Sequence, residues 1–206
     1  MSLTLLVAAA LAGTCPPFVK VSVGGDYYDA EHAQGLTVVE QYHFTPNVEA
    51  LARGQTGLLG GDIGYTLEHF PNHPRALAAM ARLALRTKTG QVPGAQFSVE
   101  CYFQRALEYR PSDGAARALY GAYLMALKRD ADAARELQAA VDSDPANAAA
   151  WYNLGLVQVR RKDLASALAA AHKAYALGFA LPGLRRQLEA ANAWQEPPSL
   201  DAVVAH

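Results

Sequence analysis

Residues 145–177, PANAAAWYNLGLVQVRRKDLASALAAAHKAYAL, decide how this chain folds. They coincide with residues 111–143, PSDGAARALYGAYLMALKRDADAARELQAAVDS, when the sequence is moved along itself by 34 residues. At that offset the residues with special backbone or packing roles fall on one another: Pro111 and Pro145, Gly121 and Gly155, Ala133 and Ala167, Ala140 and Ala174. A fixed offset of this size is the signature of a repeat architecture.

Each unit contains two apolar stripes with helical periodicity, separated by a short polar turn. The stripes predict helices over 115–127 and 132–143 in one unit, and over 148–160 and 164–177 in the next. A proline opens each unit because it cannot continue the preceding helix. The shared glycines and alanines are expected where the two helices of a pair pack closely.

Two further units precede these. Residues 71–113 repeat the pattern with six extra residues, which fall in the loop 87–96, TKTGQVPGAQ, and this loop is expected to protrude. Residues 45–70 form a more divergent pair that begins with Thr45 as a helix N-cap. Three glycines between 58 and 70 weaken its second helix, so we expect close packing or a local break there.

The run Trp151-Tyr152-Asn153-Leu154-Gly155, followed by Ala167 and Ala174, resembles the tetratricopeptide repeat (TPR) family. The resemblance implies an all-α fold, a TPR-like α-solenoid of helix-turn-helix repeats over 45–181, divided into 45–70, 71–113, 114–147 and 148–181. Beyond the repeats, an apolar stripe in 182–194 predicts a capping helix, and 195–206 are expected to form a flexible tail.

Members of this family bind partners through a concave groove formed by the first helix of each pair. The resemblance places this groove on nine residues of the chain: Arg75, Arg82, Leu85, Arg86, Met125, Tyr152, Asn153, Leu156 and Arg160. Its basic end suits a partner segment with an acidic end. An alternative stays open, in which the arginines lie on a solvated helix face and pair with nearby acidic residues.

The segment 13–44 lies outside the resemblance. Residues 18–23 (FVKVSV) and 36–44 (LTVVEQYHF) are rich in β-branched and aromatic residues and predict a short extended or β segment. Exposed strand edges pair readily with another chain, which favours self-assembly into a filament. The same strands could instead pack over the first helices of their own chain.

The N-terminus indicates export. Residues 3–11 are apolar and uncharged, and a small-x-small triplet ends at position 12, so residues 1–12 are interpreted as a signal peptide. The run is too short to cross a bilayer, so we expect no integral membrane segment in the mature chain. No basic residue stands within 1–4, and a buried N-terminal helix is the alternative. A periplasmic or extracellular chain would allow Cys15 and Cys101 to pair, although the spacing also fits two unpaired thiols.

Composition narrows the function further. A formal net charge of −1 and a pI near 6.6 disfavour nucleic acid as a partner. No motif of a nucleotide site, a metal site or a catalytic triad occurs, so we expect no enzyme activity, no cofactor and no metal. The sequence thus predicts a non-catalytic scaffold that binds a protein or peptide, with a head-to-tail filament of identical copies as the alternative.

Overall fold

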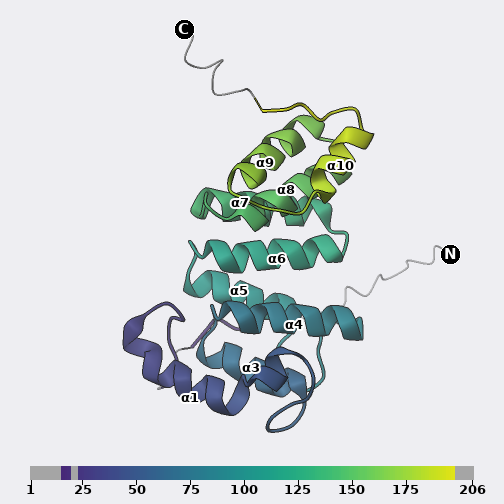
Figure 1. The fold of residues 1–206 in the computed structure, drawn as a ribbon. Coiled ribbons are helices and arrows are strands. Elements are labelled where there is room, and N and C mark those ends of the chain that lie inside the picture. The colour runs from purple at the N-terminus through teal and green to yellow at the C-terminus, as the bar shows by residue number, and fades with distance from the viewer. Residues whose placement is uncertain (1–14, 20–22, 198–206) are drawn as a thin grey trace, which may run out of the picture.

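The computed structural model describes residues 15–19 and 23–197. This part of the chain is all-helical, with 64% helix and no strand (Figure 1). The elements in order are η1 (Ala30–His32), α1 (Ala33–His43), α2 (Pro46–Glu49), α3 (Leu59–His69), α4 (Pro74–Thr87), α5 (Val99–Tyr109), α6 (Gly114–Ala126), α7 (Asp130–Ser143), α8 (Ala148–Arg160), α9 (Leu164–Ala176) and α10 (Gly183–Ala190). None of these helices is long and apolar enough to span a membrane.

Local sequence sets the helix boundaries. Helices α6 and α8 begin and end at positions that differ by the 34-residue offset. Both start with the same device, because the side chains of Asp113 and Asn147 accept a hydrogen bond from the backbone amide three residues later. Helices α5 and α7 each end two residues before a proline, at Tyr109 and Ser143.

The helices from α3 onward stack in chain order, so that neighbours in sequence are mostly neighbours in space (Figure 1). Helix α6 packs against α7, α7 against α8, and α8 against α9. One apolar core runs through the stack from Phe44 to Ala170. A second, smaller cluster lies at the C-terminal end, where Leu184 and Leu188 of α10 are fully buried against α8 and α9.

The prediction of a strand over 36–44 is wrong. Residues Ala33–His43 form α1, which packs against α3. Val39 and Phe44 are buried, so apolar contacts with the rest of the chain outweigh the β-propensity of Thr37, Val38 and Val39. Of the other predicted strand, 18–23, residues 20–22 lie outside the described residues, as do the predicted signal peptide and residues 198–206.

The insertion between α4 and α5 packs against α3, where we expected a protruding loop. Val92 is almost fully buried. Gly60 and Gly64 on α3 make room for the insertion and for α5, since a β-carbon at Gly60 would lie 2.4 Å from the carbonyl oxygen of Pro93, and one at Gly64 would lie 2.6 Å from the hydroxyl of Tyr102. The costly glycines of α3 are therefore explained by close packing.

An N-terminal strap, residues 15–19, crosses α5. A disulfide joins Cys15 to Cys101. The buried guanidinium of Arg105 donates hydrogen bonds to the carbonyl oxygens of Pro16 (2.9 Å) and Pro17 (3.2 Å). Phe18 packs edge-on against Tyr109, with 5.0 Å between the ring centroids. The strap is thus held against α5 by the disulfide, by the hydrogen bonds from Arg105 and by the packing of Phe18 on Tyr109.

Candidate interaction face

Helices α4, α6 and α8 carry all nine residues of the predicted groove, and we call the surface they present the first-helix face. The structure distributes these residues unequally between exposed and internal positions. Arg75, Arg82, Leu85, Arg86 and Arg160 are exposed, Met125, Asn153 and Leu156 are half-buried, and Tyr152 is buried. Most of the exposed side chains in this set therefore lie on α4, whereas those on α6 and α8, apart from Arg160, are half-buried or buried.

Two of the predicted arginine anchors already contact the N-terminal helices of their own chain. Arg75 forms ion pairs with Glu40 of α1 and Glu49, the last residue of α2. Arg82 donates a hydrogen bond to the carbonyl oxygen of Glu49 at 2.8 Å. These guanidinium groups hold α1 and α2 against α4. The ion pairs of Arg75 are of the intrachain kind that the alternative interpretation expects. An acidic partner would have to displace these contacts to reach the two arginines.

The arginines at the ends of α4 and α8 make equivalent contacts. Arg86 donates to the carbonyl oxygen of Leu51 at 2.9 Å, and Arg160 donates to that of Met125 at 3.2 Å. In both cases the acceptor lies 35 residues earlier in the chain. Arg160 also pairs with Asp130 at 2.6 Å. Each of these arginines therefore bridges its own helix to the unit before it.

The junction between α4 and α6 lacks this bridge, because position 126, which corresponds to Arg86 and Arg160, is alanine. A pocket of about 350 Å³ lies at this junction. Its lining residues come from the end of α4, the following loop, the start of α5 and the end of α6: Ala84, Leu85, Lys88, Thr89, Gly90, Glu100, Tyr123 and Leu127. We call it the α4–α6 pocket.

One hydroxyl in the α4–α6 pocket has no partner. Tyr123 is only 4% exposed, yet its hydroxyl makes no hydrogen bond within the described part of the chain. The oxygen keeps some accessible surface, since it is not among the polar atoms sealed inside the protein without a partner. Burial, together with the nearby Glu100 carboxylate, raises the pKa of Tyr123, so the phenol stays protonated and can donate.

The one carboxylate of the pocket is already neutralised. Glu100 accepts two hydrogen bonds from Arg129, at 2.7 and 2.8 Å, and one from the hydroxyl of Tyr120 at 2.9 Å. Lys88, by contrast, makes no side-chain hydrogen bond or ion pair with the described residues. The free charge at the rim of the pocket is therefore positive.

No protein-family model matches this sequence, and a search of curated proteins finds none that matches it.

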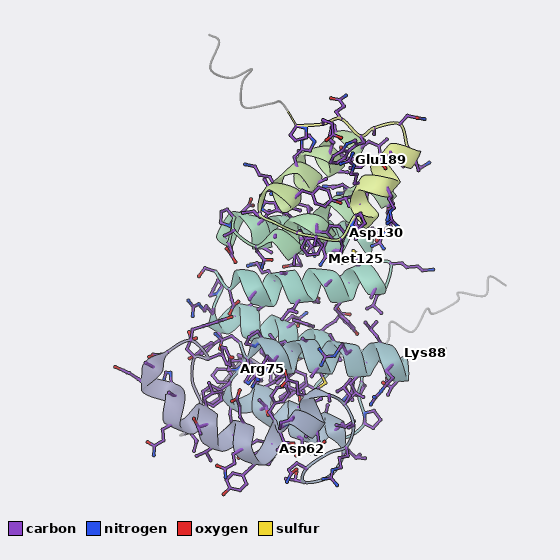
Figure 2. The ribbon with its side chains drawn as sticks, viewed as in Figure 1. Asp62, Arg75, Lys88, Met125, Asp130 and Glu189 are labelled. Carbon is purple, nitrogen blue, oxygen red and sulfur yellow. A yellow bond between two sulfur atoms is a disulfide. The ribbon has the colours of Figure 1, made fainter. Side chains whose placement is uncertain are left out.

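Lys88 belongs to a row of three lysines in equivalent positions. Lys88, Lys128 and Lys162 follow α4, α6 and α8, and all three have positive φ angles, of 55°, 61° and 64°. Glycine is the usual residue in this left-handed conformation, which is costly for other side chains. Lys88 and Met125 lie along the same side of the stack (Figure 2). These lysines form a basic edge beside the first-helix face.

The C-terminal end of the predicted groove is partly core. Tyr152 stacks on Phe179 with 4.3 Å between the ring centroids, and its hydroxyl lies close to Gly183 at the start of α10. The side chain is thus covered by the capping helix. Asn153 and Leu156, its half-buried neighbours on α8, remain accessible from the first-helix face.

A larger cavity, of about 460 Å³, lies between α9, α10 and residues 194–197. Its polar groups are already paired. His172 Nε2 lies 2.7 Å from the carbonyl oxygen of Gln195, and Arg185 binds Glu189 and Glu196. Over the described residues, no three His, Cys, Asp or Glu side chains are close enough to hold a metal ion together. The α4–α6 pocket, by contrast, contains polar groups that have no partner in the described part of the chain.

Of the residues that line the pocket, Leu85 was assigned to the groove from the sequence, whereas Tyr123, Lys88 and Leu127 were missed. Tyr123 occupies a helix position that repeat packing directs inward, so it was not assigned to the groove. Lys88 and Leu127 lie at or beyond the ends of helices. A signal for the lysines was present, because Lys128 and Lys162 are 34 residues apart and Lys88 takes the same place in the unit with the six-residue insertion.

Proposed function

We propose that this chain is a TPR-like α-solenoid that acts as an exported, non-catalytic scaffold and binds a segment of another protein on its first-helix face. The observation that carries the proposal is the repeated bridge from Arg86 to Leu51 and from Arg160 to Met125. Equivalent contacts hold α4 against the unit before it and α8 against α6. A continuous surface on stacked helix pairs is how solenoid proteins bind extended partners.

Export is supported by the bond between Cys15 and Cys101, because disulfides persist mainly in oxidising compartments. It is also supported by the apolar run at 3–11. Cell fractionation, with mass spectrometry of the N-terminal peptide, tests this part. A mature chain that begins at Gly13 outside the cytoplasm supports it, and a chain retained in the cytoplasm with its first twelve residues contradicts it.

Site-specific photo-crosslinking tests the binding face. A photoreactive amino acid at Leu85 or Leu156, on the first-helix face, should give protein adducts in the native compartment. The same group at Gln104 of α5 or Gln138 of α7, both exposed on second helices, is the matched control. Adducts from all four positions at equal yield, or from none, would contradict a dedicated face.

Self-assembly is the second candidate. The sequence argument for self-assembly was a pair of exposed strands, and it is weakened because Ala33–His43 form the helix α1. Val38 and Tyr42 on α1 are nevertheless 44% and 56% exposed. Exposed apolar side chains on one helix favour contact with another protein surface. Light scattering after size exclusion distinguishes the two functions: a uniform monomer excludes a filament, and ordered polymers that Tyr42→Lys abolishes would favour it.

A further inference from the structure

The α4–α6 junction differs from the junctions on either side of it. Arginine closes the flanking junctions by reaching a carbonyl oxygen of the preceding unit, at Leu51 and at Met125. Ala126 has no group that can do so, and the open space remains as the α4–α6 pocket. The middle of the first-helix face is therefore the place where the chain leaves a gap between units unfilled.

The walls of the pocket suit an aliphatic side chain. Leu85 and Leu127 are 38% and 41% exposed, on the two helices that border the gap. Burying these two side chains against an apolar group would be favourable, because the hydrophobic effect scales with the apolar area removed from water. The volume, about 350 Å³, lies at the lower end of the range for ligand pockets and fits a short segment.

The polar groups of the pocket suit a carboxylate. The Tyr123 hydroxyl keeps some accessible surface and has no acceptor within the described residues, and Lys88 at the rim is a cation without a counter-ion there. Lys128, at the end of α6, likewise has no ion pair in that part of the chain. The carboxylate of Glu100 does not repel an anion strongly, since Arg129 and Tyr120 already hold it.

We propose that the α4–α6 pocket seats an acidic segment of a partner protein, with an aliphatic side chain between Leu85 and Leu127 and a neighbouring carboxylate accepting hydrogen bonds from Tyr123 and Lys88. This inference rests on the proposed scaffold function and deepens it by assigning the partner's chemistry. The pairing of an apolar anchor with a charged neighbour is a common way for a groove to fix both affinity and register.

A peptide titration followed by amide chemical shifts tests the proposal. The probe is a pentapeptide with blocked ends and a central leucine flanked by aspartates, added to the isotopically labelled full chain with its disulfide intact. Saturable shifts are expected at Leu85, Lys88, Gly90 and Leu127. A peptide with lysines in place of the aspartates, and one with serine in place of the leucine, should each bind at least about tenfold more weakly.

Matched variants separate the pocket from general charge. Tyr123→Phe removes only the hydroxyl and should raise the dissociation constant about threefold to tenfold. Lys88→Gln should do the same and reduce the salt dependence of binding. Lys162→Gln changes a lysine of the same backbone conformation at the end of α8 and should leave binding unchanged. Circular dichroism melts of each variant check that the fold is retained.

Several outcomes would overturn the inference. They are shifts centred outside the pocket, equal effects of Lys88→Gln and Lys162→Gln, equal binding of the lysine-flanked peptide, and no saturable shift with any peptide at millimolar concentration. The scaffold function is tested separately by crosslinking from Leu85 and Leu156. Adducts on the first-helix face without peptide binding in the pocket would therefore reject the acidic segment and keep the scaffold.

Discussion

The guanidinium of Arg160 donates a hydrogen bond to the carbonyl oxygen of Met125, at 3.2 Å, across the junction between α6 and α8. Arg86 makes the equivalent bond to Leu51 across the junction between α2 and α4. The Met125 carbonyl lies in the last turn of α6, and the Leu51 carbonyl lies two residues after α2. Each contact therefore joins two units through a backbone acceptor near the end of a helix.

Removal of this bridge should weaken the stack. Arg160→Met keeps most of the apolar stem but loses the bonds to Met125 and Asp130, and we expect the free energy of unfolding to fall by about 1 kcal/mol. Urea denaturation measures it. Arg161→Met is the control, because within the described residues the Arg161 side chain bonds to Gln158 of the adjacent helix α8 and to no other unit, and a change within about 0.5 kcal/mol is expected. Equal losses in both variants would contradict a role for the bridge.

Introduction of the bridge at the open junction should have the opposite effect. Ala126→Arg places a guanidinium where it can reach the carbonyl oxygen of Leu85, and residue 126 is exposed, so the longer side chain meets no core. We expect unfolding to require about 1 kcal/mol more, measured by urea denaturation. A variant with Ala149→Arg, exposed at the start of α8, should not gain stability. A gain in that variant as well would mean that added charge alone is responsible.

His73 should make stability depend on pH. The side chain is fully buried, its Nε2 lies 2.9 Å from Glu40, and its Nδ1 accepts from the Ala76 amide, so the ring caps α4 in the neutral form. Burial lowers the pKa of His73 to about 4. Since the unfolded chain, with a pKa near 6.5, binds the proton more tightly, stability is full above about pH 6.5 and falls as the pH drops toward 4.

The size of this effect follows from the linkage relation. Between about pH 7.5 and pH 5, His73 should cost about 2 kcal/mol of unfolding free energy. The check is a series of guanidinium denaturation curves across this range. His73→Asn retains a capping acceptor without a titrating group and should reduce the loss by about that amount. An unchanged pH profile in the variant would show that other groups control the dependence.

The disulfide should contribute a large part of the stability. Cys15 and Cys101 are 86 residues apart, and closing a loop of this length stabilises a fold by roughly 4 to 5 kcal/mol in the chain-entropy model. Reduction of the chain, or Cys101→Ser, should lower the denaturation midpoint to the same value. A variant with both cysteines replaced by serine should be insensitive to reductant. A reduced chain as stable as the oxidised one would contradict this expectation.

The insertion should be sensitive to the size of residue 60. Gly60→Ala places a β-carbon 2.4 Å from the carbonyl oxygen of Pro93, and we expect a loss of about 1 to 3 kcal/mol despite the better helix propensity of alanine. Thermal unfolding by calorimetry measures it. Gly57→Ala is the control, because no atom lies within 4 Å of its β-carbon. If Gly60→Ala were as stable as Gly57→Ala, the loop would not be packed against α3 in solution.

Much of the helical pattern was accessible from sequence because its determinants are local. The 34-residue offset, the apolar stripes and the prolines predicted helices that begin and end within about two residues of α6, α7, α8 and α9. Glycines in α3 predicted close packing there. The helix boundaries and the glycine positions can be recognised from residues a few positions apart, or by comparing the two units that match at the 34-residue offset.

Only the tertiary structure decided what depends on residues far apart in the chain. Residues 36–44 are helical because Val39 and Phe44 pack into the core, although their propensity alone favours a strand. Arg75 contacts α1 and α2, and Arg82 contacts α2, and both helices lie more than twenty residues away in the chain, so their exposure to a partner could not be judged from their own helix.

The α4–α6 pocket is the clearest case of this division. The sequence by itself determined that position 126 is an alanine where two equivalent positions are arginine, and that a lysine follows the first helix at the equivalent position of three units. It did not determine that the gap stays open, or that the Tyr123 hydroxyl has no acceptor within residues 15–19 and 23–197. Both properties depend on how α4, the following loop, α5 and the end of α6 pack together. Packing between distant segments is not determined by the local preference of the backbone.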